Sequence, residues 1–158
     1  MEPNISIRAI WEDDDLVEIE ASACNESFSG RTQVYTTYDE LQTFCASLAG
    51  FPVSPSSRLT STAGKAGSYS LFQLKVYCID SACHTAVRAT IESNVPTKWR
   101  SQQKHSVGLE MHFEPSALDQ FQRQLAALIS AHSGEAILSG VGEYTRNIGP
   151  KDLTLRCS

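Results

Sequence analysis

Long hydrophobic runs and a secretory signal are both missing from this sequence of 158 residues. No apolar run approaches the ~20 residues that a membrane-spanning helix needs. The N-terminal stretch has neither the basic start nor the continuous apolar segment of a signal peptide. We therefore expect a cytoplasmic protein that does not associate with membranes.

Basic residues are fewer than acidic ones, since the sequence has 13 Lys and Arg but 18 Asp and Glu. The net charge of −5 and the pI near 5.3 argue against a nucleic-acid-binding protein. Phosphate contacts need clustered positive charge, which this sequence lacks. The same balance suits a protein whose partner is basic.

The cysteines are scattered, and their number is odd. They are Cys24, Cys45, Cys78, Cys83 and Cys157. A secreted domain held together by disulfides has a dense, even-numbered set. The cysteine pattern therefore favours a reducing compartment, in agreement with a cytoplasmic location.

Motifs that hold phosphate or activate a nucleophile are absent. The glycine-containing segments at 63–67 and 140–144 do not join a strand to a helix, as a phosphate-binding loop does. None of the four histidines lies in a cysteine-hydrolase signature. Because these motifs are absent, we predict no cofactor and no catalytic residue.

Six stretches show the apolar-polar alternation of half-buried strands. They span residues 5–11, 16–23, 27–36, 69–78, 84–92 and 106–113. The side chains expected to face inward include Ile5, Ile7, Ala9, Trp11, Val17, Ile19, Phe28, Val34, Phe72, Leu74, Val76, Cys78, Val87, Ile91, Leu109, Met111 and Phe113.

Two amphipathic helices are expected, at about 38–49 and from Pro115 onward. Thr37 and Glu40 form a capping-box pattern at the first start, and Gly50 supplies the stop. The strand-to-helix pattern of segment 34–50 recurs 77 positions later, at 111–129. Internal duplication and a chance match between two amphipathic patterns both account for this similarity.

The remaining segments are polar. Residues 52–68 are rich in Ser, Thr, Gly and Pro, and we expect an exposed, mobile loop there. The polar loop 94–104 contains Trp99, which with Tyr35 is a candidate interface aromatic. The tail, 133–158, is expected to be irregular, with short extended candidates at 136–138 and 153–156.

The order βββα-βββα predicts a single α+β domain over residues 1–158. Neighbouring strands joined by tight turns pair antiparallel. One face of each strand set is apolar, so the two helices should pack on one side. We expect one continuous curved antiparallel sheet of about six strands.

Acidic residues gather at the turn between the first two strands. They are Glu12, Asp13, Asp14, Asp15, Glu18 and Glu20. The run lacks the ligand spacing and central glycine of an EF-hand, so we predict no metal site there. A solvated hairpin tip is one interpretation. The other is a surface that docks a basic protein partner, and we take these six residues as the candidate partner-binding site.

Cys78, Cys83 and His84 form a C-x4-C-H pattern across a predicted turn. A structural zinc site would need a further ligand, and the chain has no second cysteine pair. A cysteine- or metal-dependent enzyme centred on these residues remains an alternative, as does oxidation of the two cysteines. A third alternative is a module that holds a small ligand on the concave face of the sheet.

These elements resemble the WapI-type immunity proteins of bacterial contact-dependent toxin systems and their uncharacterised relatives. The resemblance covers about residues 16–130 and differs at the 52–68 loop, the turn around Asp80 and the tail. The matching residues are Phe28, Ser29 and Gly30, Asp39, Glu40, Leu41, Phe44 and Leu48, Val107 to Met111, and Leu118, Phe121, Gln124 and Leu125. The resemblance implies a cytoplasmic protein that binds and blocks a toxin, such as a secreted or contact-dependent one, without catalysis of its own.

Overall fold

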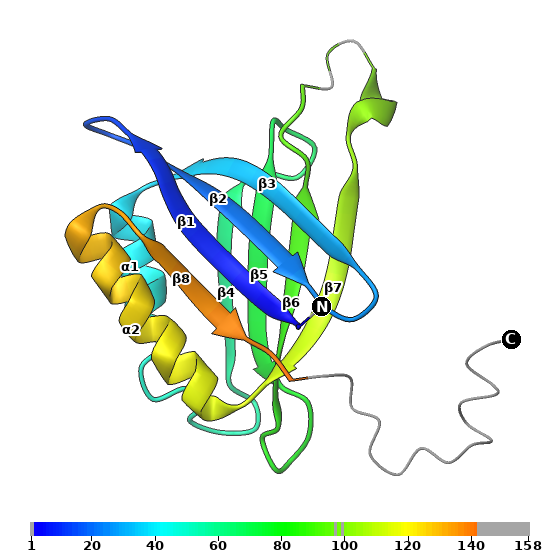
Figure 1. Cartoon of the computed structure of the whole chain (residues 1–158). Coiled ribbons are helices and arrows are strands. Elements are labelled where there is room, and N and C mark those ends of the chain that lie inside the picture. The colour runs from blue at the N-terminus through cyan, green and yellow to red at the C-terminus, as the bar shows by residue number, and fades with distance from the viewer. Residues whose placement is uncertain (1, 97, 99, 142–158) are drawn as a thin grey trace, which may run out of the picture.

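The structure, a computed structural model, describes residues 2–96, 98 and 100–141. This part of the chain forms eight strands, two α-helices and one short 3-10 helix (Figure 1). The strands are β1 (Asn4–Glu12), β2 (Val17–Cys24), β3 (Ser29–Thr36), β4 (Arg58–Gly64), β5 (Leu71–Cys78), β6 (Thr85–Glu92), β7 (Ser106–Phe113) and β8 (Glu135–Ser139). The helices are α1 (Tyr38–Ser47) and α2 (Pro115–Ala131), and the 3-10 turn is η1 (Ser101–Gln103).

The strands form two antiparallel sheets of four strands each, in the orders β3-β2-β1-β8 and β4-β5-β6-β7. The α+β class and the antiparallel pairing are therefore confirmed. The prediction of one continuous sheet of six strands is wrong. The chain leaves the first sheet through α1 after β3 and begins the second sheet with β4. Alternation along a strand says which face is buried, but it does not say which distant strand pairs with it.

Strand β4 lies inside the segment that composition predicts as a loop. It pairs with β5 from Arg58 opposite Tyr77 to Gly64 opposite Leu71. Leu59, Ser61 and Ala63 turn toward the interior, while the residues between them are exposed. Ser and Thr are tolerated in this strand because cross-strand packing, rather than composition, decides whether a strand forms.

Part of the predicted irregular tail is also a strand. The extended candidate at 136–138 is confirmed as β8, which pairs antiparallel with β1 and closes the first sheet. A short bridge then joins Val141 to His112 of β7. The candidate at 153–156, Cys157 and Trp99 lie outside the described residues.

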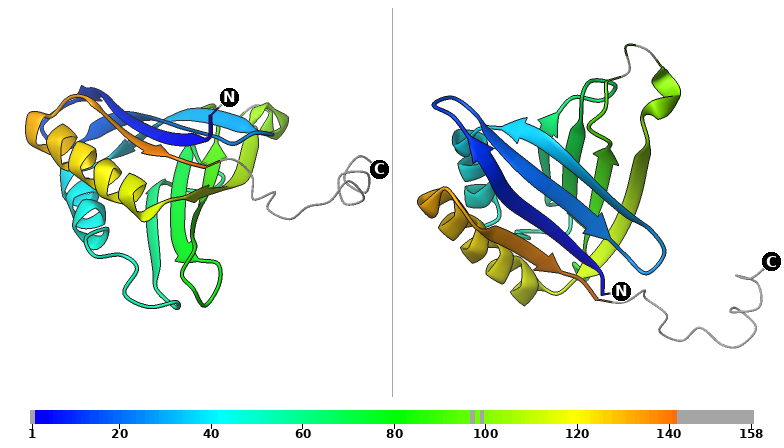
Figure 2. Two further views of the ribbon diagram at one scale, coloured as in Figure 1. Left: turned by 60° about the horizontal axis from the view of Figure 1, so that its bottom comes forward. Right: turned by 45° about the horizontal axis from the view of Figure 1, so that its top comes forward.

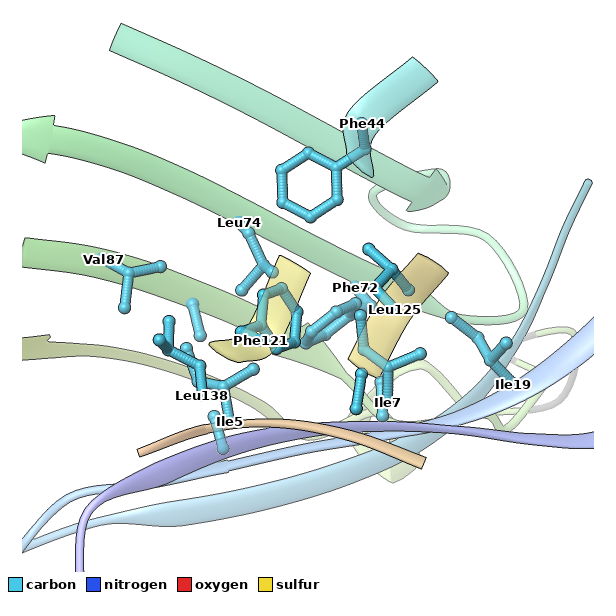
Figure 3. Packing of buried hydrophobic residues seen from close by; sticks show 14 of the residues in the cluster. Ile5, Ile7, Ile19, Phe44, Phe72, Leu74, Val87, Phe121, Leu125 and Leu138 are labelled. Carbon is cyan, nitrogen blue, oxygen red and sulfur yellow. The ribbon is translucent and has the colours of Figure 1, made fainter. Parts of the chain in front are cut away.

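The core lies between the inner faces of the two sheets and is completed by the helices, which lie on one side of the molecule (Figure 2). Side chains from both sheets and both helices converge on it (Figure 3). Phe121 and Leu125 of α2 are 1% and 0% exposed, and Ile5 of β1 is also fully buried. The two helices also exchange hydrogen bonds, since Gln122 Nε2 donates to the Cys45 carbonyl at 3.0 Å.

The ends of α1 follow the predicted signals with one change. The Thr37 hydroxyl accepts the Glu40 N–H at 3.1 Å, as an N-cap should. The Glu40 carboxylate does not form the second hydrogen bond of a capping box, to the Thr37 N–H. It accepts a hydrogen bond from the Thr36 hydroxyl at 2.7 Å instead. The helix ends two residues earlier than the predicted 49, at Ser47, and Gly50 has the expected positive φ of 72°.

Two aromatic residues predicted to face inward are exposed. The pairing of β1 with β2 shifts between Ala9 and Trp11, so one extra residue reverses the facing and leaves Trp11 51% exposed. Phe28 is 63% exposed because it belongs to the β2–β3 turn, where its N–H donates to Asn25 Oδ1 at 2.8 Å. Cys78, at the end of β5, is only partly buried.

Candidate protein-binding surface

The β1–β2 turn carries the predicted acidic site. Asp13 Oδ1 accepts the N–H groups of Asp15 at 2.8 Å and Leu16 at 2.7 Å, and the Asp13 N–H donates to the Leu16 carbonyl at 2.9 Å. These backbone hydrogen bonds hold the pKa of the Asp13 carboxyl below its usual value. Asp13 therefore shapes the turn, while Asp14 and Asp15 project from it with exposed side chains and no cation paired with them among the described residues.

Glu12 connects the turn to the end of α2. Its Oε2 lies 2.9 Å from Nδ1 of His132, the residue that caps α2 in a left-handed conformation. The His132 ring stacks on Tyr38 at the start of α1, with ring centroids 4.0 Å apart. Glu12 is thus linked through His132 to the end of α2 and the start of α1, and this link fixes the position of the hairpin relative to the helices.

The last two acidic residues differ from one another. Glu20 accepts a hydrogen bond from Arg8 at 2.7 Å, and this contact keeps the pKa of Glu20 low. Arg8 therefore neutralises much of the Glu20 charge. Glu18 instead hydrogen-bonds to the Tyr35 hydroxyl and raises the pKa of that phenol.

Glu18 is the centre of a row that crosses the outer face of the first sheet. It pairs in register with Trp11 of β1 on one side and Tyr35 of β3 on the other. The two rings meet edge to face, with centroids 6.1 Å apart, and Tyr35 is 43% exposed. The structure thus places two exposed aromatic rings beside the acidic turn. Of these two rings, the sequence suggested only Tyr35 as an interface residue, because the bulge that turns Trp11 outward has no sequence signal of its own.

A depression of about 370 Å³ lies between the acidic turn and the start of α1. Its walls are Glu12, Asp13, Asp14, Asp15, Leu16, Thr37, Tyr38, Asp39 and His132. Asp39 was not part of the predicted site, and it extends the acidic surface from the turn onto α1. Among the described residues, no three or more His, Cys, Asp or Glu side chains are arranged to hold a metal ion.

The alternative centre at the β5–β6 turn has a different character. His84 Nδ1 lies 2.6 Å from Asp80 Oδ2. Burial and a hydrogen bond with Cys83 raise the pKa of the Cys78 thiol to about 11. A nucleophilic cysteine needs a lowered pKa, so the surroundings of Cys78 disfavour the reactive thiolate.

The third alternative required a hollow on the inner face of a sheet. The inner faces of both sheets carry the packed core instead. Two depressions among the described residues border α1, and both lie at the surface. Both are open to solvent and their walls mix polar and apolar side chains, which suits contact with another macromolecule better than enclosure of a small molecule.

Comparisons with family models, with curated proteins and with solved structures give no match for this chain. No helix in the described part of the chain is both long and apolar enough to cross a membrane.

Proposed function

We propose that this chain is a non-enzymatic protein-binding domain with a basic protein partner, and that it acts in the cytoplasm as an immunity protein that neutralises a toxin. One observation carries the proposal: exposed acidic groups at the β1–β2 turn adjoin two exposed aromatic rings. Acidic groups steer a basic partner toward the surface, and exposed aromatic side chains serve as anchors in protein interfaces. The sequence resemblance to immunity proteins supplies the choice of a toxin.

The first test concerns the partner. If a large polymorphic toxin is encoded immediately upstream of this chain's gene, its toxic domain should bind the purified chain. Co-expression of the chain should then protect cells from that domain. A toxic domain that neither binds the chain nor is neutralised by it would remove the immunity function.

The second test concerns the surface. Asp14→Lys with Asp15→Lys reverses two charges and leaves the Asp13 turn intact, so the fold should persist. We expect toxin affinity to fall by at least about tenfold, mainly through slower association at low salt. Glu114→Lys with Asp119→Lys makes the same change in net charge at two exposed positions, the N-cap residue before α2 and a residue within α2, and should leave affinity near that of the unchanged chain. Equal loss in both double variants would show a net-charge effect and contradict the assignment of the turn.

A further inference from the structure

A groove runs beside β4, an edge strand of the second sheet, which pairs only with β5 among the described strands. The groove has a volume of about 480 Å³. Five consecutive residues of β4, 58–62, form one wall, and α1 forms the other. The α1 residues are Asp39, Glu40, Thr43, Phe44 and Ser47.

The β4 wall presents backbone hydrogen-bonding groups. In an antiparallel pair, alternate residues direct their N–H and C=O groups away from the partner strand. Along 58–62 these groups face the side opposite β5. A row of this kind is a template for one more strand, and five residues of extended chain span roughly 17 Å.

The side chains give the groove an apolar middle and an acidic end. Phe44, which is 6% exposed, and the half-buried Leu59 form the apolar part. Thr43 and Ser47 on the α1 wall are small and exposed, so they leave room for side chains of an incoming strand. Asp39 lies at the start of α1 and also borders the depression under the acidic turn.

The groove wall also contains a basic residue, Arg58, which packs on an aromatic ring. Arg58 lies over the Tyr77 ring of β5, with Cζ 5.9 Å from the ring centroid. Among the described residues, no ion pair joins Arg58 to Asp39 or Glu40, so the acidic end around Asp39 keeps its negative charge. This charge suits an occupant that carries Lys or Arg near Asp39.

We propose that the groove binds an extended, basic segment of a partner protein by β-strand addition to β4. One apolar side chain of the segment packs on Phe44, and one basic side chain reaches Asp39. Main-chain hydrogen bonds to β4 supply affinity, and the two side-chain contacts supply selectivity. The inference rests on the proposed function in one respect, that the chain binds protein, but its contacts lie on different elements from the acidic turn.

The test uses short random peptides displayed on phage and selected on the immobilised full chain. Selected peptides should be enriched in Lys or Arg and in alternating apolar residues. Synthetic versions are then titrated against the chain by fluorescence anisotropy. In the complex, backbone amides of residues 58–62 should exchange more slowly with solvent than in the chain alone.

Matched variants locate the contact. Thr43→Trp fills the groove from an exposed position and should weaken peptide binding by at least about tenfold. Gln42→Trp places the same side chain on the neighbouring exposed position of α1, outside the groove, and should bind as the unchanged chain does. Unchanged denaturation midpoints in both variants confirm that folding is intact.

Other outcomes overturn the inference. Selection of no peptide above background would do so, as would equal binding by the Thr43→Trp and Gln42→Trp variants. A second copy of the chain paired along β4, seen as a dimer that Thr43→Trp dissociates, would replace the partner segment. Peptide binding lost in the Asp14→Lys, Asp15→Lys variant but kept in Thr43→Trp would assign it to the acidic turn and leave the proposed function standing.

Discussion

The acidic residues of the hairpin have different roles because they have different hydrogen-bond partners. Glu20 is neutralised by Arg8, and Glu12 is tied to His132. Asp13 accepts backbone N–H groups and so contributes to the turn itself. Asp14 and Asp15 are therefore the residues whose charge a partner would meet first. The sequence predicts the cluster, but it cannot rank the members because the partners of Glu20 and Glu12 are 12 and 120 positions away.

Tyr77 is the residue whose titration best reports the packing of the second sheet. Burial, together with a hydrogen bond to Glu110, raises the pKa of Tyr77 from 10.0 to about 12. Because the pKa in the folded state is above that in the unfolded state, this contribution to stability is fully present below about pH 10. It is lost as the pH rises toward about 12.

The pKa of Tyr77 can be measured directly from the ultraviolet absorbance of the phenolate. One tyrosine of the folded chain should titrate near pH 12, and Tyr77→Phe should remove that step while keeping the ring under Arg58. Glu110→Gln should move the step toward lower pH but leave it raised, since burial is the larger cause. A Tyr77→Phe variant with an unchanged titration at the alkaline end would contradict the assignment.

At the scale of elements, the β4–β5 hairpin shows how a polar segment is held in a strand. Gly64, the last residue of β4, has a φ of 79° and faces the Ser70 carbonyl and the Val34 side chain of β3. A Cβ at Gly64 would lie 2.9 Å from Val34 Cγ2 and would also collide with the Ser70 carbonyl oxygen. Close approach of the backbone therefore requires glycine here, and it brings β4 against the first sheet.

Alanine substitutions at two glycines separate this close approach from the backbone conformation alone. Gly67 in the same hairpin has a similar φ of 76° but nothing within 4 Å of an added Cβ. We expect Gly67→Ala to lower the free energy of unfolding by about 1 kcal/mol. Gly64→Ala should cost at least about 2 kcal/mol more, because overpacking is added to the unfavourable φ. Urea denaturation measures both, and equal losses would mean that β4 does not approach β3 so closely.

At the scale of the whole molecule, β8 joins the two ends of the described chain. It follows α2 directly and pairs with β1, so the last strand of the described residues lies beside the first (Figure 1). Leu138 turns into the shared core and is 1% exposed, whereas its neighbour Ile137 is 37% exposed. The first sheet is therefore complete only when residues more than a hundred positions apart have met.

Two substitutions test this closure on a single strand. Leu138→Ala should reduce the free energy of unfolding by about 2–5 kcal/mol, as expected for a buried leucine. Ile137→Ala should cost less than about 1 kcal/mol because its side chain is partly in solvent. Chemical denaturation at equilibrium gives both values. Similar small losses would show that β8 does not belong to the core.

The local elements of this protein can be derived from its sequence alone. Six strands, both helices and the antiparallel α+β class follow from side-chain periodicity, from Thr37 and Pro115 at the helix starts, and from short turns. These features depend on neighbours a few residues apart, so they can be read along the chain.

How these elements combine depends on tertiary contacts. The division into two sheets, the pairing of β8 with β1, and the recruitment of β4 from a Ser- and Thr-rich segment all depend on contacts between distant residues. The outward position of Trp11 depends on a bulge opposite β2, and the groove exists because α1 lies beside an edge strand. Periodicity says which face of an element is apolar, but the shared core decides which elements bury those faces against one another.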